Sequence, residues 1–200
     1  TPLYSSAASD VYKRQVSAVS IVAIFIIIFC VFKSISLPII LVAAIEFAIF
    51  INMGLPYYLG TTLPFIASVV IGTIQLGATV DYAILMTTRY KKERNEGAGK
   101  KEAIATALST SIPSIIVSAL GFFAATFGVG AYSSVDMVAS LCKLMSRGAI
   151  ISMFVVIFVL PSFFVVFDKV IRYTSIGFGQ KDKKEKAKNV AYASTDTYSK

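Results

Sequence analysis

The sequence alternates between five long apolar runs and short polar segments. The apolar runs cover residues 16–32, 37–53, 63–88, 104–129 and 144–167. Each run is long enough for a helix to cross the hydrocarbon core of a bilayer, which is about 30 Å thick and needs roughly 20 residues. The pattern therefore predicts an all-α fold, a polytopic bundle of five transmembrane helices.

The two ends of the chain lack this apolar pattern. Residues 1–15 are small and polar without a clear period, so we set them apart from the transmembrane domain predicted for residues 16–173. Residues 174–200 are rich in Lys, Asp, Ser and Thr, again without an apolar period. Such a composition is typical of disorder, so we expect a disordered basic tail there.

Composition supports a membrane protein and argues against other classes. Hydrophobic residues make up 56% of the chain, charged residues 15%, and the mean hydropathy is +0.75, whereas a soluble domain has about 25% charged residues. The net charge of +8 comes from loops and the tail, which favours contact with anionic lipid head groups over nucleic acid. The chain has no His and only two Cys, so we expect neither a metal site nor a cofactor.

The positive charges also predict an orientation. Fifteen of the nineteen Lys and Arg residues lie on the side that holds residues 89–103 and the C-terminus. Cytoplasmic loops carry the excess of Lys and Arg in membrane proteins. We therefore expect a multi-pass protein of the plasma membrane of a bacterial cell, with both of these segments in the cytoplasm.

Asp81 is the main candidate for function, because an ionisable side chain inside a membrane span is costly, and we expect its carboxyl to be buried at a helix contact. It follows Thr73 and Gly77 at intervals of four residues, so all three share one stripe of a helix. Gly77, with Thr73, is expected to form a close helix contact. Tyr82 adjoins the acid and could hydrogen-bond to another acid or only anchor the contact.

Three serines on the fourth span form a second candidate group. Ser111, Ser114 and Ser118 share a face at helical spacing. Hydroxyls donate and accept hydrogen bonds, so they could satisfy an acid in either protonation state. The alternative is that these serines only pack and bond to their own backbone.

Three further residues are open to more than one interpretation. Glu46 is the only charge in the second span, and it could serve function or a structural pairing, so we note it as a possible secondary polar site. Arg147 begins the fifth span and is expected to extend to the membrane surface. Pro161 is expected to kink its helix, as is Pro113 in the fourth span.

The segment GATVDYAILMTTRYKKE, which contains Asp81 and Tyr82, resembles the MMPL branch of the RND superfamily of proton-driven exporters. The resemblance covers roughly residues 16–173. Members of this family have twelve spans in two repeats, and this chain is similar to spans eight to twelve. The resemblance implies that Asp81 and Tyr82 belong to a proton relay facing an equivalent pair in the other repeat, and that Ser111, Ser114 and Ser118 line it.

The resemblance also implies a function and partners. We expect one membrane half of an exporter of lipids or other hydrophobic molecules, driven by the proton gradient and not an enzyme. Its partners would be the missing N-terminal repeat and outer domains, membrane lipids and the hydrophobic substrate, and an oligomer is compatible with this. Residues 1–15 do not resemble the family's outer domain, so we interpret them as an artificial junction, or else as a divergent remnant of that domain.

Two other functions fit parts of the sequence. A lipid-sensing or sterol-sensing membrane domain, or a scaffold, would use the packing face and would not need the acid. An intramembrane aspartyl protease would need two acids that share a water, and Glu46 with Asp81 is the available pair.

Overall fold

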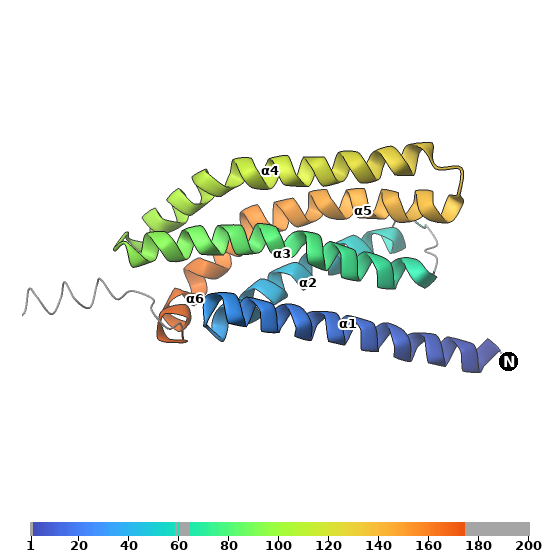
Figure 1. Cartoon of the computed structure of the whole chain (residues 1–200), viewed down its shortest axis with the longest axis horizontal. Helices are drawn as coiled ribbons and strands as arrows, with labels where there is room; N and C mark the ends of the chain where they lie inside the picture. The colour runs from blue at the N-terminus through green and yellow to red at the C-terminus, as the bar shows by residue number, and fades with distance from the viewer. Residues whose placement is uncertain (1, 59, 61–64, 175–200) are drawn as a thin grey trace, which may run out of the picture.

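The computed structural model describes residues 2–58, 60 and 65–174, and the described part of the chain consists of helices joined by short connections (Figure 1). The helices are α1 (Pro2–Phe32), α2 (Ser36–Tyr58), α3 (Phe65–Asn95), α4 (Lys100–Tyr132), α5 (Asp136–Phe154) and α6 (Leu160–Thr174). A π-helical segment, Val155–Val159, joins α5 to α6. Five stretches in this part of the chain are long and apolar enough to cross a membrane, α5 and α6 forming one of them. The predicted all-α bundle of five spans is confirmed.

The helices extend beyond the apolar runs that predicted them. The fourth helix covers Lys100–Tyr132 instead of 104–129. The fifth begins at Asp136 instead of residue 144, so the connection between α4 and α5 is only residues 133–135. Asp136 lies in the first turn of α5, where a negative charge favours the helix dipole. Helical backbone thus continues through polar residues that a hydropathy pattern cannot assign.

The N-terminal segment is part of a helix. α1 begins at Pro2, so residues 2–15 continue into the first span without a break. Only Ile28 and Phe32, at the far end of α1, are well buried among its described side chains. The disorder expected for the tail concerns mostly residues 175–200, which lie outside the described residues, as do positions 63 and 64 of the third predicted span.

α3 is the central helix of the bundle. It contacts α4 and α5 on one side and α1 and α2 on the other (Figure 1). The core between these helices includes Leu41, Ile45, Met86 and Ile115, all essentially inaccessible to solvent. Side chains on α3 are therefore positioned by contacts with every other span.

The last span changes direction near Pro161. Proline has no N–H to donate to the preceding turn, and its ring crowds that turn. The π-helical segment Val155–Val159 lies immediately before it, and the N–H of Leu160 bonds to the oxygen of Val155. π-segments and prolines are common causes of sharp bends. α6 leaves the line of α5 and packs against α2 and α4 (Figure 1). Pro113 lies inside α4, which continues as one helix from Lys100 to Tyr132.

Candidate functional site

Asp81 and Tyr82 lie near the middle of α3 and differ in exposure. The side chain of Tyr82 is buried, with 7% exposed, whereas Asp81 is exposed. Successive residues on an α-helix point about 100° apart, so the phenol faces the bundle while the carboxyl faces outward. The buried carboxyl that we expected is therefore not found among the described residues, because Asp81 lies on an open face of the bundle.

The structure brings Asp81 and Tyr82 together with two of the predicted serines. One pocket of about 420 Å³ lies between α3 and α4. Its lining residues are Ala78, Asp81, Tyr82, Leu85, Ser114, Ser118 and Phe122. The carboxyl and two hydroxyls thus share one hollow, with an apolar wall on each side. Such a pocket has room for a small number of waters beside the carboxyl.

Ser111 does not join this pocket. Its side chain is fully buried, and its hydroxyl oxygen has no hydrogen-bond partner among the described residues. The buried positions of α4 advance by four residues, through Ala107, Ser111 and Ile115. Each step of four turns the contact line by about 40° around the helix. That line has turned away by the level of Ser114 and Ser118, and leaves them on the open side.

Thr73 and Gly77 are not at a close helix contact within this chain. The Thr73 hydroxyl donates to the carbonyl oxygens of Val69 and Val70, at 3.1 and 3.1 Å. Gly77 is exposed, and a β-carbon added there would meet no atom within 4 Å. The close contact expected at these two residues is absent from the part of the chain that the structure describes.

Glu46 lies in a different pocket from Asp81. It is half-buried on α2 and lines a cavity of about 480 Å³. The polar groups beside it come from Thr73 on α3 and from Ser17 and Ser20 on α1. Because the two acids line separate pockets, the geometry gives no support to an aspartyl protease that needs them to share a water.

A network of buried polar groups, missed by the sequence analysis, joins α2, α3 and α5. Arg147 donates from Nε to Oδ1 of Asn52 at 3.0 Å and from a terminal nitrogen to the Asn52 carbonyl at 2.8 Å. The Asn52 amide donates to Gln75 Oε1 at 2.8 Å, and the Gln75 amide donates to the Ser152 hydroxyl at 2.9 Å. Arg147 therefore binds a neighbouring helix, which the expectation of an arginine reaching for the membrane surface did not include.

A glycine makes room for this network. A β-carbon added at Gly148 would lie 2.6 Å from the Asn52 amide nitrogen and 2.8 Å from Gln75 Oε1. Both distances are shorter than a β-carbon tolerates. The close helix approach expected at Gly77 is thus found at Gly148.

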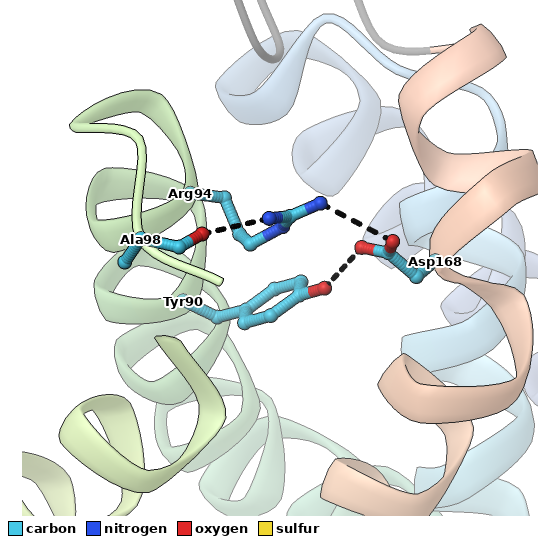
Figure 2. A network of polar contacts seen from close by, with 4 residues as sticks. All are labelled: Tyr90, Arg94, Ala98 and Asp168. Atoms are coloured by element: carbon cyan, nitrogen blue, oxygen red, sulfur yellow. Dashed lines mark hydrogen bonds and ion pairs between the residues drawn. The ribbon is translucent and has the colours of Figure 1, made fainter. Parts of the chain in front are cut away.

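A second missed network lies at the charge-rich end of α3 (Figure 2). The Tyr90 hydroxyl donates to Oδ1 of Asp168 at 2.5 Å, and Arg94 forms an ion pair with Oδ2 at 3.3 Å. Another Arg94 nitrogen donates to the Ala98 carbonyl at 2.7 Å. Asp168 and Arg94 are 6% and 7% exposed. The Tyr90 ring also stacks on Phe164, with centroids 4.8 Å apart. This network fixes α6 against α3.

One signal in the sequence could have revealed Asp168. Leu160, Phe164, Asp168 and Ile171 follow one another at helical spacing, and all four are buried. The predicted fifth span ends at residue 167, so Asp168 falls just outside it as the first charge after the apolar run. The periodicity of the apolar residues is a better guide to burial here than the first charge.

Comparison with known proteins places this bundle in a family. The sequence profile of the MMPL family matches residues 5–192. The membrane protein ActII-3 of Streptomyces coelicolor is 26% identical over 110 residues, which are 55% of this chain and 15% of that protein. The match to the family begins at residue 5, inside the segment that we had set apart.

A solved structure shares the fold. SecDF of Thermus thermophilus, a translocon-associated membrane protein, superposes with a TM-score of 0.69 at 22% sequence identity. The superposition covers 78% of this chain and 22% of the SecDF chain. The chain therefore spans less than a quarter of the length of either relative. From the match along most of its length, this multi-pass membrane protein belongs to the MMPL family.

Proposed function

We propose that this chain is one membrane half of an exporter of lipids or other hydrophobic molecules, driven by the proton-motive force, with Asp81 as the proton carrier. The main support is the open pocket that contains Asp81, Ser114 and Ser118 halfway along two transmembrane helices. A carboxyl facing lipid at this depth is costly. A second polar surface, from the other repeat of the same transporter, would complete the pocket and remove that cost.

Protonation would change how the pocket packs. A protonated Asp81 is neutral and can donate one hydrogen bond, whereas the carboxylate only accepts. The hydroxyls of Ser114 and Ser118 can accept in the first case and donate in the second. The charged form favours water and donors in the pocket, and the neutral form favours closure of α3 on α4. Alternating between these forms couples proton flow to helix movement.

The proposal includes an orientation and partners. Residues 89–103 and the C-terminus would lie in the cytoplasm, by the distribution of Lys and Arg, with the protein in the plasma membrane. The outer domains of the complete transporter would select the substrate. The chain would act without a cofactor or enzymatic chemistry, since the proton gradient supplies the energy.

Replacement of Asp81 by Asn tests the proposal. Asn keeps the shape of the side chain and cannot exchange a proton. In the complete transporter, reconstituted in vesicles with an imposed proton gradient, we expect Asp81→Asn to reduce substrate export and the accompanying proton flux to background. Asp136→Asn is the matched control, because Asp136 is an exposed acid at the beginning of α5. We expect that variant to transport normally.

The same measurement distinguishes the alternative function. A lipid-sensing or scaffold domain uses the packing face only, so Asp81→Asn would keep its activity. Export at the level of the unaltered protein in Asp81→Asn, with correct folding, would reject the proton relay.

A further inference from the structure

A pocket at the charge-rich end of the bundle is separate from the proposed proton relay. Its volume is about 430 Å³, and it lies between the end of α1 and the last turns of α3. Its lining residues are Val31, Phe32, Thr88, Lys91, Lys92, Asn95 and Glu96. None of them lines the Asp81 pocket, and the bonds to Asp168 come from Tyr90 and Arg94.

Positive charge gathers at this pocket. Lys91 and Lys92 line it, and Lys33 directly follows the lining residue Phe32 and repels Lys91 electrostatically. Glu96 is the one acid among the lining residues. Three cations at such short range repel one another. An anion placed between them would relieve that repulsion.

The hydrogen bonds leave donors available for an anion. The Lys91 ammonium donates to the carbonyl oxygen of Phe32 at 2.8 Å, which holds it against the end of α1. An ammonium group has three donors, so two remain free to point into the pocket. The side chains of Lys33 and Lys92 are exposed. The pocket can therefore offer several N–H donors to one group of oxygens.

The apolar surface beside the pocket fits a lipid. Ile27 and Val31 lie one turn apart on α1, and each is 55% exposed. The apolar run of α1 ends at Phe32, next to Lys33, so the pocket lies where the hydrocarbon core gives way to head groups. A molecule with a phosphate in the pocket and an acyl chain along Ile27 and Val31 would match both surfaces.

We propose that this pocket, lined by Lys91, Lys92 and Asn95 with Lys33 next to its wall residue Phe32, binds the phosphate head group of an anionic phospholipid. Basic pockets between transmembrane helices are suited to such head groups. The bound lipid would connect the end of α1 to α3, the helix that carries Asp81. The proposed lipid site is argued only from the charge and shape of this pocket, so it does not require that the protein export a substrate.

Substitution of two lysines tests the lipid site. The ammonium groups of Lys33 and Lys92 make no hydrogen bond or ion pair within the described residues, so Lys33→Gln with Lys92→Gln should leave the fold intact. Lys101→Gln with Lys169→Gln is the matched control, because it removes two exposed charges from the same end of the molecule outside the pocket. The probe is phosphatidylglycerol, titrated into the complete protein in phosphatidylcholine nanodiscs and counted by native mass spectrometry.

We expect each of these two lysines to contribute about fivefold to the affinity for phosphatidylglycerol, so the double variant should weaken binding by about 25-fold. The control pair should change it by less than about twofold. Equal losses in both variants would show general attraction to a charged surface and overturn the site. Competition by millimolar inorganic phosphate would assign the pocket to a soluble anion and would also overturn the lipid proposal.

Discussion

Asp81 and Tyr82 show how a single step along a helix separates two roles. The phenol is buried in the bundle and the carboxyl is on the open face. Hydropathy was sufficient to single out Asp81, because an acid inside an apolar run stands out. Its placement beside Ser114 and Ser118 depends on how α4 crosses α3, which a single sequence does not specify. The same crossing excludes Ser111 from the pocket.

At the residue scale, the room at Gly148 gives the first stability prediction. Gly148→Ala places a methyl group 2.6 Å from the Asn52 amide nitrogen, so the buried network must shift or break. We expect a loss of about 1–3 kcal/mol in the free energy of unfolding, as for other overpacked sites. Denaturant titration in detergent, followed by circular dichroism, measures it.

Gly121→Ala is the control for this prediction. Gly121 lies in α4, and an added β-carbon would meet nothing within 4 Å. Alanine is favoured over glycine in a helix by up to about 1 kcal/mol, so this variant should be as stable as the original protein or slightly more stable. Equal losses in the two variants would show that helix backbone effects, and not the Asn52 network, determine the result.

At the scale of elements, hydropathy predicted the five spans but not where the helices begin and end. The charged flanks of α3 and α4 remain helical. Capping residues and packing determine where a helix ends, and hydropathy measures neither of them. The polar contact between α3 and α6, formed by Tyr90, Arg94 and Asp168, was also not predicted from the sequence. Tyr90, Arg94 and Asp168 each lie in polar flanks, where a charge is unremarkable until the fold brings the flanks together.

The joint between α3 and α6 gives a second stability prediction. Asp168→Asn removes the charge that pairs with buried Arg94. A buried cation that loses its partner is costly, so we expect about 3 kcal/mol of destabilisation. Tyr90→Phe keeps the ring that stacks on Phe164 and removes the hydroxyl that donates to Asp168, so we expect about 1–2 kcal/mol. Unfolding titrations of both variants, under one set of detergent conditions, measure the two losses.

Tyr173→Phe is the matched control for the joint. Tyr173 lies on α6, and 96% of its side chain is exposed. Its hydroxyl is hydrated, so the substitution should leave the free energy of unfolding unchanged within about 0.5 kcal/mol. A loss in Tyr173→Phe as large as that in Tyr90→Phe would contradict a specific role for the bond to Asp168.

For the whole molecule, the five spans predict the sides on which the connections lie. The single span α4 separates the connection of residues 96–99 from the connection of residues 133–135, so the two lie on opposite sides. In a background with Cys30 and Cys142 replaced by Ala, we expect Ser134→Cys to react with a membrane-impermeant maleimide added outside intact cells. Gly97→Cys should react only after the cells are opened.

Lysine placement decides which of the two sides is the cytoplasm, so this labelling also tests the charge rule. Labelling of Gly97→Cys from outside intact cells, with Ser134→Cys protected, would reverse the proposed orientation. Labelling of both from one side would contradict the number of spans.

The turn between α4 and α5 has a mechanical consequence. It contains only residues 133–135, and the two helices lie against each other along much of their length (Figure 1). A connection this short limits how far α4 and α5 can move relative to each other, so we expect the two helices to move together. A movement that displaces Ser114 and Ser118 would therefore also move α5, and the hydrogen bonds from Arg147 to Asn52 would carry it to α2.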